Sequence, residues 1–470
     1  MKKTGLRCLI LCIVLTFLPI TVFGSQTGDD YAVSSGSHSI DATASLLGYQ
    51  KLIDNCSSAL LFEMDTQTMM YAWNVDEKIY PASFVKIMTA YIAIDRGTLN
   101  DIVVVTPDMM STIASDAIST NFQVDEVFNL LDLIYMLQVD SSNDAATVIA
   151  CHIGGTQQNF VKIMNEYAAE IGCVNTNYTN PHGFHNDNQY STARDTARLL
   201  AVAMENETFR TIFATTHYTI PATNKSDARE LSTGNFLMSK DTMSRYFDSR
   251  VVGSRTGVNI AGFRGIASVA EHKGLRFISI ITGSVSEMSA NGYYTEKYGG
   301  FDETIELLDL GFSGFNPVQL FYDDQILTQQ TVLNGDCQVS LGTKETFSAI
   351  LPVNTSSDVL TFKYSSTFAD LEAPIEKGEK LSSVEVWYGS ICIAKTDLYA
   401  MNKVSVIQQQ NDTQIDDNEK EPWPVWLTVI VVVLLVVMFV FVTTWGVRMV
   451  RRATVNKRSR LHRKNRRRSR

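Results

Sequence analysis

Ser83 and Lys86 have the types and the spacing of a nucleophile and its base. They lie three positions apart in YPASFVKIMTAYIAI, residues 80–94, which is apolar nearly all round after Pro81. Residues three apart share one face of a helix, and a serine nucleophile needs a base within hydrogen-bond reach. Such an apolar helix is usually buried, and burial disfavours the charged form of lysine. The pair alone would also fit a helix cap with an exposed lysine, because Ser-x-x-Lys is a common tetrapeptide.

Two further motifs give this pair a context. VDSSNDAA contains Ser141 and Asn143 between two stretches of helical pattern, and VGSRTGVNI contains Arg255, Thr256 and Gly257 at the start of an expected strand. Either motif alone is uninformative, since Ser-x-Asn often caps a helix and Thr-Gly often forms a turn. Together and in this order, the three motifs resemble the S-x-x-K, S-x-N and K-T-G elements of penicillin-recognising serine enzymes.

The resemblance extends over most of the chain. Successive blocks between about residues 59 and 404 are similar, in the same order, to the D-alanyl-D-alanine carboxypeptidases, the low-molecular-weight penicillin-binding proteins of peptidase family S11. These blocks are YPASFVKIMTAYIAI, SSNDAA, NPHGFHN, STARD, RTGVNIAGFRGIAS and EAPIEKGEKLSSVEVWYG. The resemblance implies removal of the terminal D-alanine from peptidoglycan stem peptides through an acyl-enzyme, with β-lactams as acylating inhibitors and without a metal or cofactor.

The same resemblance assigns catalytic roles to three residues and substrate binding to a fourth. Ser83 is expected to be the acylated nucleophile and Lys86 the base that takes its proton. Ser141 is expected to take part in proton transfer, and Asn143 to hold the amide of the substrate. The lysine needs a pKa near 7 to act as a base, about three units below the ordinary value for this side chain.

The same resemblance assigns further substrate binding to the Arg-Thr-Gly motif. Arg255 and Thr256 are expected to hold the terminal carboxylate of the substrate, and Gly257 and Val258 belong to the same binding segment. Backbone N–H groups of Ser83 and Val258 are expected to form an oxyanion hole, in which one donor is worth about 10²–10³ in rate.

The chain departs from the family pattern at two positions near these motifs. The family usually has threonine where this chain has Val85, which points away from Ser83 and should change packing only. The family usually has lysine in place of Arg255. An arginine keeps its charge and can bind a carboxylate through two parallel hydrogen bonds, so we expect Arg255 to receive the carboxylate and to lower the pKa of Lys86.

The expected fold is of the α/β (α+β) class. By resemblance, residues 46–315 form a serine β-lactamase/DD-peptidase-like domain, with an antiparallel sheet flanked by helices. The pattern changes to short alternating segments after residue 316, which predicts a small β-sandwich domain over residues 316–403.

Both ends of the chain predict a membrane protein. Residues 1–24 have the layout of a secretory signal peptide, and the uncharged residues 425–447 are long enough to span a bilayer once. Twelve of the 40 basic residues lie in the tail 448–470, without an acidic residue among them. The positive-inside rule therefore places this tail in the cytoplasm and the catalytic domain outside the cell membrane. A flexible spacer (residues 25–45) and an acidic linker (residues 404–424) complete the predicted organisation.

Other interpretations remain open at this point. The acidic body of the chain does not suit nucleic-acid binding. A DD-endopeptidase of the same fold, a β-lactamase, or a catalytically silent cell-wall-binding homologue are the alternatives, although we find no convincing deacylating glutamate for a β-lactamase. His182 and His185 fit a structural loop better than a metal pair. Five widely spaced cysteines follow the signal segment and predict no disulfide framework.

Overall fold

The computed structural model describes two units of the chain, which divide at Val406 and are treated separately. The described residues are 39–41, 45–48, 50–111, 121–240, 245–290, 295–355, 357–365, 368, 370–407 and 425–465. The predicted signal peptide and most of the predicted spacer and linker lie outside these residues.

A five-stranded sheet is the frame of the first domain, and every neighbouring pair of strands is antiparallel, as predicted. The strand order is β2-β1-β9-β8-β7, so β7 forms one edge of the sheet. The strands are β1 (Ser58–Glu63), β2 (Thr68–Trp73), β7 (Val251–Val258), β8 (Arg264–His272) and β9 (Leu275–Ser284).

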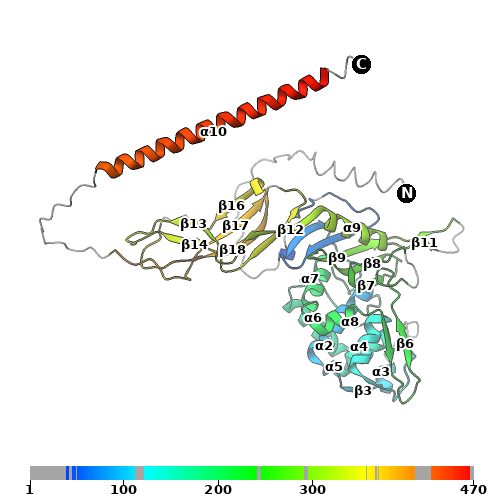
Figure 1. Ribbon diagram of the computed structural model, residues 1–470. Coiled ribbons are helices and arrows are strands. Elements are labelled where there is room, and N and C mark those ends of the chain that lie inside the picture. The colour runs from blue at the N-terminus through cyan, green and yellow to red at the C-terminus, as the bar shows by residue number, and fades with distance from the viewer. Residues whose placement is uncertain are drawn as a thin grey trace. The chain divides into compact units, whose positions relative to one another are not determined.

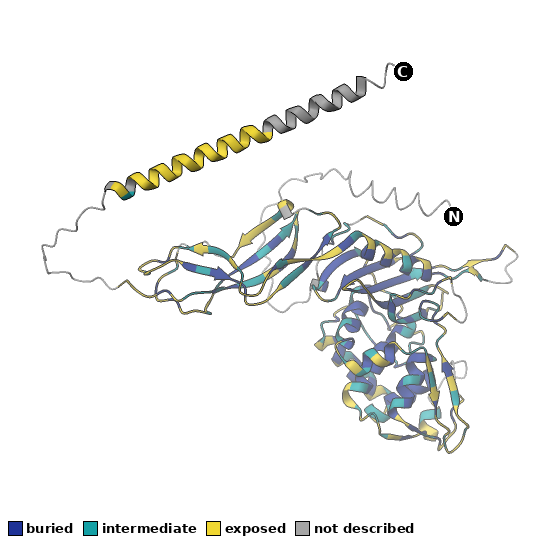
Figure 2. Ribbon diagram, viewed as in Figure 1, coloured by how far each residue is buried: buried dark blue, intermediate teal, exposed yellow. Residues whose placement is uncertain are grey.

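The two faces of this sheet are buried against different helices. Along β1, Leu60 and Phe62 join one hydrophobic cluster, whereas Ala59 and Leu61 join the other. This alternation follows from the period of two in a strand. Figure 1 shows α9 against one side and the remaining helices of the domain gathered on the other, and Figure 2 shows both cores as buried.

The helical side of the domain carries the segments that position the site. Its main helices are α2 (Val85–Arg96), α4 (Leu130–Val139), α5 (Asn143–Gly154), α6 (Gln157–Glu170), α7 (Ala193–Ala203) and α8 (Glu207–Phe213), and α9 spans Phe301–Gly314. Smaller elements are η1 (Ser39–Asp41), η2 (Ala82–Phe84), α3 (Pro107–Ser111), and the strand pairs β3 (Ile102–Val104) with β4 (Val127–Asn129), β5 (His217–Ile220) with β6 (Arg229–Ser232), and β10 (Glu287–Met288) with β11 (Thr295–Lys297).

The segment before the sheet is in part well packed. Ile40 falls within the range predicted as a spacer, yet it is only 1% exposed and belongs to the core. Arg194 donates a hydrogen bond to the Ile40 carbonyl oxygen, and Arg198 pairs with Asp41. Both arginines lie on α7, so η1 is attached to the first domain.

The predicted all-β domain is confirmed. Its sheets are β12 (Phe315–Phe321) with β15 (Phe347–Pro352), and a five-stranded sheet of β13 (Ile326–Gln330), β14 (Val339–Gly342), β18 (Ile391–Ala400), β17 (Lys380–Tyr388) and β16 (Leu360–Tyr364). A short turn, η3, spans Ser357–Val359. Alternate residues such as Val384 and Val386 point into a common core. The cysteines at 56, 151, 173, 337 and 392 are all free.

The second unit contains one long helix, α10 (Val425–Asn465). Its residues Val429–Met449 form an apolar stretch of 21 residues with a mean hydropathy of 2.8. Within the described part of the chain, this is the helix that is long and apolar enough to cross a membrane. It matches the position of the predicted span.

Candidate active site

Ser83 and Lys86 lie at the junction of η2 and α2, one turn apart. Ser83 is half-buried in η2, and Lys86 is the second residue of α2 and only 1% exposed. The Lys86 Nζ atom lies 3.3 Å from Ser83 Oγ, within hydrogen-bond distance. The helical spacing that suggested a nucleophile and base therefore does bring the two functional atoms together.

Burial and a neighbouring cation act on the Lys86 amine in the same direction. Desolvation lowers the pKa of Lys86 well below its usual value, and the positive charge of Arg255 lowers it further. The Nζ atom also donates to the carbonyl oxygen of His182 at 2.8 Å. Because burial and the Lys86 charge lower the pKa of the His182 imidazole to about 4, this ring is neutral at pH 7.

Ser141 approaches the same serine from the segment between α4 and α5. Its Oγ donates to Ser83 Oγ at 3.4 Å, and its backbone has a positive φ of 59°. The cap of α5 is the next residue, Ser142, which accepts from the Ala145 N–H at 3.1 Å. Ser141 is therefore not needed as a cap. Asn143 is 4% exposed, and its Oδ1 has no hydrogen-bond partner among the described residues.

Two glycines allow other segments to reach the turn that carries Ser83. Ala82 has a φ of 46°, a region that side chains rarely adopt, and such strain is concentrated at functional sites. A Cβ atom on Gly183 would lie 2.0 Å from the Ala82 carbonyl oxygen. A Cβ atom on Gly257, in edge strand β7, would lie 3.2 Å from the Ser83 nitrogen. The glycine of the Arg-Thr-Gly motif thus permits close contact between β7 and the turn.

Arg255 is buried, and its guanidinium points toward the end of α4. It is 5% exposed, and burial lowers its pKa to about 10, so it keeps its charge at neutral pH. Its Nη2 atom donates to the Leu137 carbonyl oxygen at 2.8 Å and to Gln138 Oε1. Its Nε atom has no partner among the described residues. The predicted contact of Arg255 with a substrate carboxylate stays a prediction.

The other residues of this motif alternate along β7. Thr256 is half-buried and Val258 is 49% exposed, whereas Arg255 and Gly257 are buried. Successive side chains of a strand point to opposite faces. Thr256 and Val258 therefore face away from the Arg255 guanidinium.

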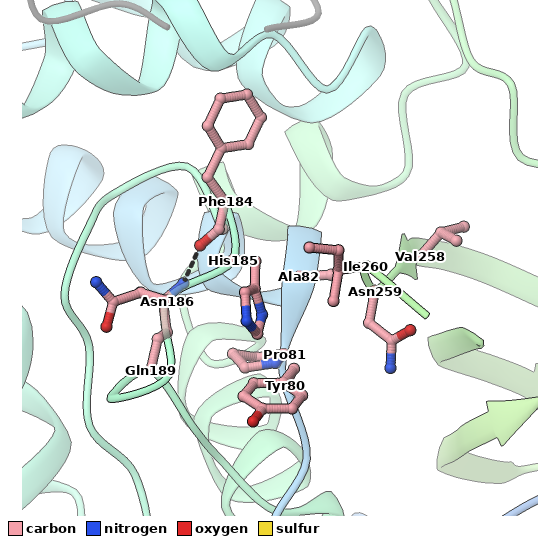
Figure 3. A pocket seen from close by; sticks show the side chains of 11 residues that line it. Tyr80, Pro81, Ala82, Phe184, His185, Asn186, Gln189, Val258, Asn259 and Ile260 are labelled. Atoms are coloured by element: carbon pink, nitrogen blue, oxygen red, sulfur yellow. Dashed lines mark hydrogen bonds between the residues drawn. The ribbon is translucent and has the colours of Figure 1, made fainter. Parts of the chain in front are cut away.

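A pocket of about 370 Å³ adjoins this turn. Figure 3 shows its walls: residues 80–82 in the middle, the loop of residues 183–189 on one side, and residues 258–260 at the end of β7 on the other. The loop is held in shape by Gln189, whose Nε2 donates to the Phe184 carbonyl oxygen at 3.1 Å. The pocket is open to solvent and reaches Ala82, the residue before Ser83.

The NPHGFHN block, expected to be a structural loop, contacts the catalytic helix in a way that sequence analysis did not specify. Its carbonyl oxygens bind α2, with Lys86 donating to His182 and Thr89 Oγ1 donating to Pro181 at 2.6 Å. His185 packs edge-on against Tyr80, with ring centroids 4.6 Å apart. Among the described residues, no group of three or more His, Cys, Asp or Glu could hold a metal ion.

Gln138 is a second residue that sequence analysis missed. It is only 9% exposed, and its Nε2 donates to the Lys86 carbonyl oxygen at 3.3 Å. The available signal was a polar residue near the end of the mostly apolar stretch LLDLIYMLQV.

Comparisons with known proteins match both domains to described families. The sequence model of the peptidase S11 family, described as D-alanyl-D-alanine carboxypeptidase, matches residues 50–286. The model of the C-terminal domain of penicillin-binding protein 5 matches residues 315–406.

Individual relatives cover both domains. The chain is 28% identical over 361 residues to the D-alanyl-D-alanine carboxypeptidase DacA of Haemophilus influenzae, covering 73% of this chain and 84% of the relative. It is 28% identical over 358 residues to DacC of Escherichia coli, covering 73% and 83%. The crystal structure of penicillin-binding protein 5 from Haemophilus influenzae superposes with a TM-score of 0.61 at 26% identity, over 76% of this chain and 99% of that one. The chain belongs to the D-alanyl-D-alanine carboxypeptidases of peptidase family S11.

Proposed function

We propose that this protein removes the terminal D-alanine from peptidoglycan stem peptides through an acyl-enzyme formed on Ser83. The observation that carries the proposal is the buried Lys86 amine, 3.3 Å from Ser83 Oγ, whose pKa burial and Arg255 lower together. A neutral amine can accept the hydroxyl proton, whereas an exposed lysine would be protonated at pH 7.

Acylation then proceeds in two proton transfers. Lys86 takes the proton of Ser83, and the Oγ atom attacks the carbonyl carbon of the penultimate D-alanine. Backbone N–H groups of Ser83 and Val258 stabilise the oxyanion. The bond to the terminal D-alanine breaks, and Lys86 passes the proton to the nitrogen of the leaving D-alanine through Ser141, whose Oγ lies 3.4 Å from Ser83 Oγ. Water then hydrolyses the ester and regenerates Ser83.

Substrate binding uses the remaining residues of the motifs. The buried Oδ1 of Asn143 lacks a partner among the described residues, so a substrate N–H would satisfy it. The positive charge of Arg255 attracts the terminal carboxylate, Thr256 offers it a hydroxyl group from the other face of β7, and Gly257 lets the binding edge approach the nucleophile. β-Lactams acylate the same serine.

The location follows from the two ends of the chain. The catalytic domain lies outside the cell membrane, α10 anchors it by a single pass, and residues 448–470 lie in the cytoplasm. The apolar stretch Val429–Met449 and the basic residues that follow it in the sequence support this arrangement.

Mass spectrometry of the full chain in detergent tests the catalytic proposal. We expect one penicillin adduct, located on Ser83, and release of D-alanine from a pentapeptide that ends in D-Ala-D-Ala. Ser83→Ala should give neither product. Stoichiometric penicillin labelling of Ser83→Ala would refute the assignment, and cleavage of a cross-linked dimer without release of terminal D-alanine would indicate an endopeptidase instead.

A further inference from the structure

Gln138 connects the two cationic residues of the site. It is the penultimate residue of α4, and both the oxygen and the nitrogen of its amide group form hydrogen bonds. The Oε1 atom accepts from Arg255 Nη2, and the Nε2 atom donates to the Lys86 carbonyl oxygen at 3.3 Å. Through these two contacts, Gln138 joins edge strand β7 to the catalytic helix α2.

We propose that Gln138 is a positioning residue that holds the Arg255 guanidinium beside Lys86 without neutralising its charge. It thereby adapts the site to arginine at a position where the family motif has lysine. This inference rests on the proposed function, because it concerns how Lys86 is kept able to accept the Ser83 proton.

The need for such a residue follows from the chemistry of a buried guanidinium. Arginine carries five N–H donors in a fixed plane, and a buried charge without acceptors is costly. The Nη2 atom of Arg255 has acceptors in Leu137 and Gln138, whereas its Nε has none among the described residues. Without the Gln138 acceptor, the Arg255 Nη2 atom would keep only the main-chain oxygen of Leu137 as an acceptor among the described residues.

The acceptor must also be uncharged. Burial and the Arg255 charge are the two causes that lower the pKa of Lys86. Among the described residues, the groups within hydrogen-bond distance of its amine are neutral, namely the Ser83 hydroxyl and the His182 carbonyl. A carboxylate at position 138 would pair with the guanidinium and offset its effect on Lys86. A glutamine supplies the same acceptor geometry without that charge.

Gln138→Glu tests the requirement for neutrality. The rate of Ser83 acylation by a fluorescent penicillin is measured against pH on the full chain in detergent. A negative charge near Lys86 favours its protonated form, so the acid limb of the profile should move to higher pH by about one unit or more. Gln158→Glu, an exposed position on α6, makes the same charge change and should leave the profile unmoved. A Gln138→Glu profile that coincides with wild type would overturn the proposal.

Gln138→Leu tests the coupling to Arg255 and does not depend on the first variant folding. In the wild-type background, loss of the acceptor should slow acylation about tenfold or more. In an Arg255→Lys background, which should itself remain labelled because a cation is retained, the same change should slow acylation less than about threefold. Equal losses in both backgrounds would contradict a role specific to arginine. A wild-type chain that penicillin does not label would instead refute the proposed function.

Discussion

The contact between Gly257 and the Ser83 turn makes a quantitative prediction. Gly257→Ala adds one methyl group, which would lie 3.2 Å from the Ser83 nitrogen, 3.3 Å from Ala82 Cβ and 3.4 Å from the Pro81 carbonyl oxygen. Ordinary van der Waals contacts lie at 3.4–4 Å. The turn or the edge strand must therefore move apart by a few tenths of an ångström, which displaces the Ser83 N–H group.

We expect Gly257→Ala to affect both stability and catalysis, by free energies of similar size. Overpacking by a methyl group costs about 1–3 kcal/mol in a well-packed region, and the loss of glycine freedom in the unfolded chain returns about 0.4–1 kcal/mol. Removal of one oxyanion-hole donor costs about 10²–10³ in rate. Displacement of the donor should cost somewhat less, so we expect acylation to slow by about tenfold to a hundredfold.

The assay is the rate of acylation by a fluorescent penicillin, measured beside the thermal unfolding midpoint. Gly234→Ala is the matched control, because its added Cβ would meet nothing within 4 Å. Gly183→Ala should be worse than Gly257→Ala in both measurements, since its Cβ would lie 2.0 Å from the Ala82 carbonyl oxygen and its φ is 92°. An acylation rate of Gly257→Ala equal to that of the control would show that this contact does not position the nucleophile.

Three other predictions concern the charges and the membrane topology. Lys86→Met should abolish acylation, and the variant should remain folded. Because the pKa of Lys86 is lowered in the folded protein, the unfolded chain binds one more proton between that folded pKa and 10.5, so the free energy of unfolding of the wild type should rise there by up to about 1.4 kcal/mol per pH unit. Urea titrations at several pH values should not find this slope in the variant. Arg255→Lys should retain most carboxypeptidase activity, whereas Arg255→Ala should lose about 1.5–3 kcal/mol of transition-state binding. Equal kcat/KM values for wild type and Arg255→Ala would argue against any contribution from the cation. Protease added to intact spheroplasts should release an active fragment and spare an epitope on residues 448–470; digestion of that epitope would reverse the proposed topology.

Local patterns in the sequence were sufficient for the features that depend on neighbouring residues. A short run of consecutive residues is enough to predict each of three features: the helical spacing of Ser83 and Lys86, the alternation in the β domain, and the apolar stretch within α10. A period of 3.6 or 2, or an uncharged run of bilayer length, determines such features almost without reference to the rest of the chain.

The tertiary structure determined where the side chains of the site point and which groups they contact. The sequence placed a cation before Thr256, yet only the tertiary structure turns the Arg255 guanidinium toward Leu137 and Gln138 at the end of α4. The carbonyl oxygen that accepts from Lys86 belongs to His182, 96 residues away. Contacts of this kind join segments whose sequences carry no common period. Their geometry is set by how the sheet and helices pack, and that packing also determines how strongly burial lowers the pKa of Lys86.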